Sequence, residues 1–167
     1  MKRKVLLLLT AMILLFIGIL IVNTFSLFKK KEELSTRLLK LVKIPLVDLD
    51  SAKLQITSNK KLIVVYYSTT CGNCQSELED IMENIHQFDE YNVVLISMES
   101  INEIKRFVKR YRLQRKNVFI AKIRPEDTFD TFGSLSIPHT FIYGRDSILI
   151  KEFSGPFTVE TMLKTVR

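Results

Sequence analysis

The 167-residue sequence predicts an α/β domain with a mixed central β-sheet and helices on both faces, preceded by one N-terminal transmembrane helix. Two observations predict the domain. Apolar runs of strand length alternate with amphipathic helical segments, and the chain closes with two short strands around a turn and a final helix. A third observation, an uncharged apolar stretch near the N-terminus, predicts the membrane helix. The composition, 47% hydrophobic and 26% charged, is typical of a folded protein.

The first segment, residues 1–28, is predicted to be a membrane anchor with a short basic flank. Residues 5–22 carry no charge. At roughly 1.5 Å per residue such a helix just spans a hydrocarbon core of about 30 Å, and residues 23–28 extend it. The stretch is longer than the apolar core of most secretory signals, and no Ala-x-Ala pattern follows it. We therefore expect an uncleaved anchor and a single-pass protein of the cell membrane.

Basic residues lie on both sides of this apolar segment and leave its orientation ambiguous. Three precede it, and six follow it between residues 29 and 43. By the positive-inside rule the larger cluster favours a cytoplasmic body, although the charges that emerge first often dominate. Residues 29–43 also carry Leu34, Leu38 and Leu41 at helical spacing, which predicts a polar tether between the anchor and a domain over residues 44–167.

The strands of this domain are predicted from five apolar runs: residues 62–67, 93–98, 118–123, 140–144 and 148–153. The first three are continuous, which is typical of strands buried on both faces. The last two flank a Gly-Arg-Asp-Ser turn and are predicted to form a hairpin. Because the first three alternate with helices, we expect them to be parallel, with the hairpin adding antiparallel strands at one edge.

Three helices are predicted between and after these strands, over residues 78–88, 104–111 and 158–166. Ahead of the first strand, residues 44–61 are predicted to form short strands around a turn. The densest basic run, residues 105–116, overlaps the second helix. We interpret it as a solvated cationic face, with contact to nucleic acid or anionic lipid as the less favoured alternative. The flanks of the anchor supply most of the net charge of +7, so no nucleic-acid partner is expected.

The chain has two cysteines, Cys71 and Cys74, directly after a predicted buried strand where a helix begins. The free N–H groups and the positive dipole end of a helix N-terminus favour the thiolate of Cys71, which makes it the natural attacking group. Cys74, one turn further on, can resolve the resulting mixed disulfide. A zinc site would need two more ligands, and a purely structural bridge would close too small a loop to stabilise much. We expect no metal and no cofactor beyond a redox-active Cys71–Cys74 disulfide.

A second motif, Ile137-Pro138 ahead of the predicted hairpin, is a candidate cis peptide at a strand entry. With the Cys-x-x-C at a strand-to-helix junction, it resembles the thioredoxin superfamily, and within it the membrane-anchored TlpA-like branch of thiol–disulfide oxidoreductases. The resemblance covers about residues 44–166. It implies a thioredoxin-like fold, protein thiols and disulfides as substrates, and a catalytic domain on the extracytoplasmic (periplasmic) side, which we take to outweigh the basic residues after the anchor. It leaves the redox donor unidentified, including whether that donor lies in the membrane.

The residues around the cysteines depart from the pattern of this branch in three ways. Thr70 stands where Trp is usual. Gly72 and Asn73 replace the usual Gly-Pro or Pro-Pro. Val65 takes the place of the acidic or amide residue often found six positions before the first cysteine. Asn73 favours a more oxidising pair, whereas Ile137 before the proline favours a reducing one, so the direction of electron flow stays open.

Two residues are candidates for managing the proton and the charge of the cysteines. Glu77 stands where the branch commonly has Glu and, since Val65 cannot accept a proton, is the best candidate to deprotonate Cys74. Acidic residues in the first turns of a helix also simply stabilise it, which is the alternative. His139 directly follows the proline. It either lies beside Cys71 and tunes the thiolate, or is a half-exposed histidine at a strand edge.

Two other functions remain as alternatives. A non-catalytic thioredoxin-like module that binds a partner at the membrane fits the missing Trp but not the retention of both cysteines. A peroxiredoxin-type thiol peroxidase would carry Pro and Thr where this chain has Val64 and Ser68. The predicted function is therefore a membrane-tethered thiol–disulfide oxidoreductase that exchanges disulfides with protein substrates through Cys71 and Cys74.

Overall fold

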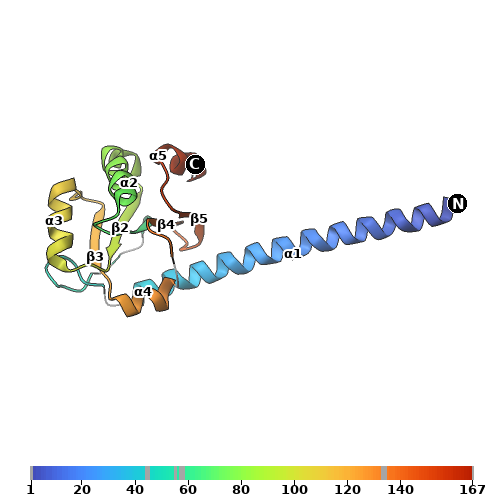
Figure 1. The fold of residues 1–167 in the computed structure, drawn as a ribbon, viewed down its shortest axis with the longest axis horizontal. Coiled ribbons are helices and arrows are strands. Elements are labelled where there is room, and N and C mark those ends of the chain that lie inside the picture. The colour runs from blue at the N-terminus through green and yellow to red at the C-terminus, as the bar shows by residue number, and fades with distance from the viewer. Residues whose placement is uncertain (1, 44–45, 55, 57–58, 133–134, 167) are drawn as a thin grey trace. The chain divides into compact units, whose positions relative to one another are not determined.

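The computed structural model describes residues 2–43, 46–54, 56, 59–132 and 135–166 (Figure 1). The chain divides into two compact units, Met1–Thr36 and Arg37–Arg167. A single unbroken helix, α1 (Lys2–Lys43), covers the predicted anchor and the predicted tether, so no change of secondary structure separates them. Within it the 22 residues Met12–Glu33 are long and apolar enough to cross a membrane.

The second unit contains a five-stranded sheet in the order β3-β2-β1-β4-β5. Its strands are β1 (Lys61–Tyr66), β2 (Tyr91–Ser97), β3 (Val118–Lys122), β4 (His139–Tyr143) and β5 (Leu149–Ser154). β2 pairs in parallel with both β1 and β3, whereas β4 is antiparallel to both β1 and β5. The prediction of three parallel strands with an antiparallel hairpin at one edge is confirmed.

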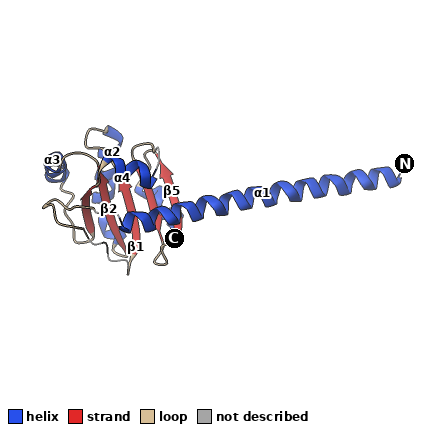
Figure 2. Cartoon of the chain, turned by 90° about the horizontal axis from the view of Figure 1, so that it is seen from below, coloured by secondary structure: helices blue, strands red, loops and turns tan. Residues whose placement is uncertain are grey.

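Helices cover both faces of this sheet, as predicted. They are α2 (Gly72–Glu83), the 3-10 helix η1 (Ile85–Phe88), α3 (Ile101–Tyr111), α4 (Pro125–Phe132) and α5 (Val159–Val166). α2, α3 and α5 share one apolar core with alternate strand residues such as Val65 and Ile142. On the other face Phe132 of α4 stacks between Tyr66 and Phe141. Figure 2 looks onto this second face, with α4 in front of the strands.

The first predicted helix ends earlier than the sequence pattern indicates, whereas the second ends at Tyr111 as predicted. The first stops at Glu83, and its apolar stripe continues through η1 to the fully buried Phe88. The basic segment is helical only up to Tyr111. Arg112 adopts a left-handed backbone conformation, φ 51°, and the C-terminal N–H groups turn back onto the Val108 carbonyl, which caps α3.

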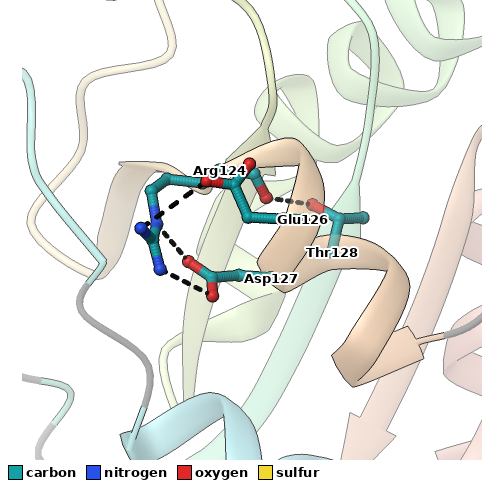
Figure 3. A network of polar contacts seen from close by, with 4 residues as sticks. All are labelled: Arg124, Glu126, Asp127 and Thr128. Carbon is teal, nitrogen blue, oxygen red and sulfur yellow. Dashed lines mark hydrogen bonds and ion pairs between the residues drawn. The ribbon is translucent and has the colours of Figure 1, made fainter.

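α4 was not predicted, because its eight residues carry too few apolar positions to show a helical period. It begins at Pro125, which is favoured at the first helical position. Arg124 binds the Asp127 carboxylate through two bonds of 2.6 and 2.9 Å and lies 3.5 Å from Glu126 (Figure 3). The Thr128 hydroxyl donates to the Arg124 carbonyl oxygen. This network, exposed at Arg124 and buried at Thr128, holds the start of the helix.

The described residues 46–54, ahead of β1, form a turn rather than the short strands that were predicted. Val47 makes single antiparallel bridges to Lys53 and Lys122, and these are isolated bridges, not strands. The Asp48 carboxylate accepts two backbone N–H bonds within the turn, at 2.8 and 2.9 Å. An Asp that satisfies backbone donors in this way favours a turn over a ladder.

Candidate active site

The two cysteines lie where β1 ends and α2 begins, as predicted. Cys71 is the N-cap residue of α2, and its Sγ lies 3.9 Å from the carbonyl oxygen of Ile137. The Ile137-Pro138 peptide is cis. Both cysteines are free thiols, Cys71 partly exposed and Cys74 fully buried. A substrate can therefore reach Cys71 directly, but not Cys74.

Three of the predicted site residues form the exposed rim around Cys71. They are Thr70, Gly72 and Asn73. A Cβ added to Gly72 would meet no atom within 4 Å, so the packing at this position does not require glycine. Pro138, by contrast, is buried, while Ile137 beside it is partly exposed.

Burial dominates the chemistry of Cys74. The side chain is 0% exposed, and burial raises the pKa of its thiol to about 12. A backbone hydrogen bond with Ser68 opposes this rise, and the Cys71 thiol and the Glu77 carboxyl add to it. At neutral pH Cys74 is therefore a protonated thiol, and a base must remove its proton before it can attack a disulfide.

Glu77 lies on the buried side of α2, three residues after Cys74, a spacing that makes helical side chains neighbours. It is 3% exposed. Its Oε1 accepts a hydrogen bond from the Thr140 hydroxyl at 3.0 Å. Its Oε2 has no partner within the described part of the chain. Burial raises the pKa of this carboxyl to about 7, with the Thr140 bond opposing the rise. A carboxyl with a pKa near neutrality is suited to take and return a proton.

The ionisation of Glu77 is expected to destabilise the folded chain as the pH rises from about 4.5 to about 7. Over this range the unfolded chain, with an ordinary pKa of 4.5, has released the proton while the folded chain still holds it, so stability falls with pH and levels off above about 7. The two pKa values correspond to a loss of roughly 3 kcal/mol. The variant Glu77→Gln should therefore match the parent near pH 4.5 and exceed its free energy of unfolding by about this amount at pH 8.

Urea denaturation of the full chain in detergent at both pH values measures this difference. Glu79→Gln, an exposed carboxyl on the same helix, is the matched control and should follow the parent at both pH values. An equal pH dependence in the parent and in Glu77→Gln would contradict the expectation.

His139 faces away from α2. Its ring is 3% exposed, so the alternative of a half-exposed histidine is wrong. Nε2 lies 2.8 Å from Oε1 of Glu152, and the ring packs on Phe141 with a centroid distance of 4.7 Å. Neighbouring residues of a strand face opposite sides of a sheet, and Thr140 faces Glu77. His139 therefore makes these contacts on the α4 side, and its influence on Cys71 stays a prediction.

A carboxylate that the sequence did not predict, Glu99, holds the loop before Cys71. Its Oε1 accepts hydrogen bonds from the Ser68 hydroxyl at 2.6 Å and from the Thr69 N–H at 3.0 Å. Burial, followed by the charges of Glu99 and Cys74, raises the pKa of Tyr67 in the same loop. The signal that could have found Glu99 is topological, because the carboxyl ends of the parallel neighbours β1 and β2 meet at one edge of the sheet.

The variant Glu99→Ala is expected to lose about 1.5–3 kcal/mol of folding stability, because two hydrogen bonds to a charged acceptor disappear and their donors are partly buried. Glu126→Ala is the comparison. It removes an ion pair whose two side chains are 59% and 63% exposed, and should lose about 0–1 kcal/mol. Urea denaturation of the full chain in detergent measures both, and equal losses would show that Glu99 does not anchor the loop.

No three His, Cys, Asp or Glu side chains in the described ranges are grouped so that they could hold a metal ion.

The site combines a Cys-x-x-C pair at the N-terminus of α2, a cis proline opposite it, and a sheet in which three parallel strands are followed by an antiparallel hairpin. Fold and site together define a thioredoxin-like thiol–disulfide oxidoreductase. The AhpC/TSA family matches residues 39–151, which is more than half of the chain, and the chain belongs to this family.

Two curated relatives are similar over most of the chain. The thiol-disulfide oxidoreductase ResA of Bacillus thuringiensis subsp. konkukian (strain 97-27) is 24% identical over 120 residues, which cover 69% of this chain and 68% of that protein. ResA of Bacillus cereus (strain ATCC 10987 / NRS 248) matches with the same figures. These matches agree with the predicted TlpA-like branch.

Solved structures share the fold. StoA from Bacillus subtilis superposes with a TM-score of 0.60 at 17% identity and covers 74% of this chain and 96% of its own. MTB dsbF gives a TM-score of 0.65 at 15% identity, covering 76% and 95%. A peroxiredoxin-like protein from Aquifex aeolicus gives 0.61 at 16% identity, covering 73% and 81%. The predicted thioredoxin-like fold is confirmed, and at these identities the likeness is one of fold.

Proposed function

We propose that this protein is a membrane-tethered thiol–disulfide oxidoreductase that exchanges disulfides with protein substrates through Cys71 and Cys74. The observation that carries the proposal is the unequal exposure of the two sulfurs, together with a base beside the buried one. Cys71 is accessible, whereas Cys74 is buried with a pKa of about 12. Glu77, with a pKa of about 7, follows one turn later.

In the reducing direction the Cys71 thiolate attacks one sulfur of a substrate disulfide, and the other sulfur leaves as a thiolate that takes up a proton. Glu77 as carboxylate accepts the proton of Cys74. The Cys74 sulfur then attacks the Cys71 sulfur and releases the second substrate thiolate, which is protonated in turn. The substrate gains two electrons and two protons, and the protein is left with the Cys71–Cys74 disulfide as its only redox group. The reverse sequence oxidises a substrate dithiol.

Ile137 and Pro138 are assigned to substrate positioning. The Ile137 carbonyl oxygen lies 3.9 Å from Cys71 Sγ. Since Ile137 is partly exposed in the loop directly before β4, an extended substrate segment can lie across this loop with its disulfide at Cys71.

The membrane tether in this proposal is α1, in which Met12–Glu33 is long and apolar enough by length and mean hydropathy to cross a membrane. We place the catalytic domain on the extracytoplasmic (periplasmic) side because the TlpA-like resemblance favours it, against the basic residues after the span. An alkaline phosphatase fused after Arg167 tests this placement. Activity of the fused enzyme in intact cells is expected, and an inactive fusion with a folded protein would place the domain in the cytoplasm.

The activity is tested with the full chain in detergent, which is first reduced and then freed of reductant. Each chain is expected to reduce one protein disulfide in a single turnover. A titration with glutathione is expected to show a two-electron reduction potential for the Cys71–Cys74 pair. A potential near about −270 mV would indicate a reductase and one near about −120 mV an oxidase. A chain that does not cycle between dithiol and disulfide would be the binding module, and faster turnover of hydrogen peroxide than of disulfides would favour the peroxidase.

A further inference from the structure

A groove beside the active-site loop is lined by cationic side chains that the exchange reaction does not use. Its volume is about 430 Å³. One wall comes from the loop and α2, the other from α3, and the residues that matter are Thr69, Thr70, Gln75, Arg106, Arg110 and Tyr111. We call it the α3 groove. Arg106, Arg110 and Tyr111 belong to the basic segment, residues 105–116, for which the sequence predicted a solvated cationic helix face.

The α3 groove shares a wall with the reactive cysteine. Thr70 directly precedes Cys71, and Gln75 lies in the first turns of α2. The side chain of Gln75 donates from Nε2 to the Thr69 carbonyl oxygen at 3.0 Å, which ties the two parts of the wall together. A segment bound in the α3 groove therefore lies only a few residues from a disulfide held at Cys71.

The α3 groove is electropositive because neither of its two guanidinium groups forms an ion pair with the described residues, although the charge of Arg106 acts on the neighbouring Glu103. Arg106 and Arg110 are exposed and lie on successive turns of α3, and neither makes a salt bridge or hydrogen bond to the residues described here. The Arg110 guanidinium lies 5.6 Å from the centroid of the Tyr111 ring, a cation–π distance. These two groups are thus free to meet an anion.

One acidic residue, Glu103, also lines the α3 groove and partly offsets this charge. Its carboxylate is engaged in the capping box of α3, where Oε2 accepts from the backbone N–H and the hydroxyl of Ser100 at 3.0 and 2.6 Å. These bonds lower the pKa of Glu103, with the charge of Arg106 as a smaller cause. With one carboxylate against two guanidinium groups, the α3 groove stays net positive.

Resting on the proposed function, we propose that the α3 groove binds an acidic segment of the protein substrate that flanks the disulfide attacked by Cys71. Guanidinium groups pair with carboxylates through parallel, charge-assisted hydrogen bonds. Charge complementarity at such a rim sets substrate choice and the rate of encounter. An anionic lipid headgroup has the same charge, but the wall shared with Cys71 favours a peptide, because a peptide occupies the α3 groove and the reactive sulfur together.

The test compares two disulfide peptides on the reduced full chain in uncharged detergent. The peptides differ only in the residues beside the cystine, Asp and Glu in one and Asn and Gln in the other. Rates are measured in single turnovers, in which each reduced chain reduces one peptide disulfide, and KM here is the peptide concentration that gives half of the maximal rate. The acidic peptide is expected to show a KM about five- to tenfold lower at a similar maximal rate, which is the size expected from two rim charge pairs. This preference should fade as the salt concentration rises.

The double variant Arg106→Gln/Arg110→Gln is expected to bring the KM ratio of the two peptides to about one. Lys109→Gln/Lys116→Gln is the matched control. It removes two exposed cations from the same segment but outside the lining of the α3 groove, and should keep the preference of the parent. An equal loss of preference in both double variants would overturn the assignment of the α3 groove as the binding site. It would show that the net positive charge of the surface, rather than these two arginines, attracts the acidic peptide.

Three further outcomes are decisive. Equal KM values for the two peptides on the parent chain would overturn this proposal and leave the proposed function intact. Failure to react with either peptide and with uncharged 2-hydroxyethyl disulfide would overturn the proposed function. Loss of the preference in nanodiscs of anionic lipid, when nanodiscs of zwitterionic lipid retain it, would assign the α3 groove to lipid headgroups instead.

Discussion

The full chain carrying Cys74→Ala is expected to form a lasting mixed disulfide with its substrate through Cys71 and to lose turnover. Cys71 is partly exposed and can still make the first attack. The adduct then persists because the sulfur that resolves it is gone, and alanine introduces neither a nucleophile nor a polar group at this fully buried position. Non-reducing electrophoresis followed by mass spectrometry of the adduct measures the outcome.

Cys71→Ala is the control for this experiment. Cys74 is 0% exposed and its thiol has a pKa of about 12, so the variant should form no adduct and show no turnover. An adduct on Cys74 in the Cys71→Ala variant would reverse the assignment of attacking and resolving sulfurs.

The variant Glu77→Gln is expected to slow the second step, the attack of Cys74 on the mixed disulfide, by about 10²–10⁴-fold while the first attack is retained. At pH 7 a thiol with a pKa of about 12 is ionised to only about one part in 10⁵. A base that removes the proton during the attack therefore has a large effect. Rapid quenching during a single turnover should show the mixed disulfide accumulating in the variant and not in the parent.

The pH profile distinguishes proton transfer from a merely structural role of Glu77. In the parent the rate of the second step should rise as the pH passes about 7, where Glu77 loses its proton and becomes a base. Above about pH 7 the rate in the parent should level off, because Glu77 is then fully ionised. In Glu77→Gln the rate should instead keep rising with pH, because it follows the ionised fraction of Cys74, whose pKa is about 12, whereas Glu79→Gln should level off like the parent. A second step in Glu77→Gln that is as fast as in the parent would eliminate Glu77 as the base and leave the proton of Cys74 to solvent.

The parts of the fold that could be predicted depend on local patterns. Apolar runs of strand length identified all five strands, and the Gly-Arg-Asp-Ser turn identified the hairpin. The pair Cys71 and Cys74 with Glu77 could be placed because three residues lie within two turns of one helix. α4 was missed, because a short helix with few apolar positions shows no period, and its start depends on the local pairing of Arg124 with Asp127.

The parts of the site that could not be predicted join residues distant in the chain. Glu99 reaches Ser68 because β1 and β2 are parallel neighbours. The side of the sheet to which His139 points follows from the register of β4 and from Thr140 meeting Glu77. Neither contact can be predicted from helical or strand periodicity in the sequence.

The sequence by itself determined the order of the strands along the chain, the apolar N-terminal helix and the position of the two cysteines proposed as the redox pair, because periodicity and helix N-terminal position are local properties of the chain. Only the tertiary structure decided which sulfur is exposed, that Glu77 is buried enough to hold a proton near neutral pH, and that Arg106 and Arg110 border the same loop as Cys71. These features depend on how segments distant in sequence exclude water from one another, and burial of that kind exists only once the sheet and its helices are packed.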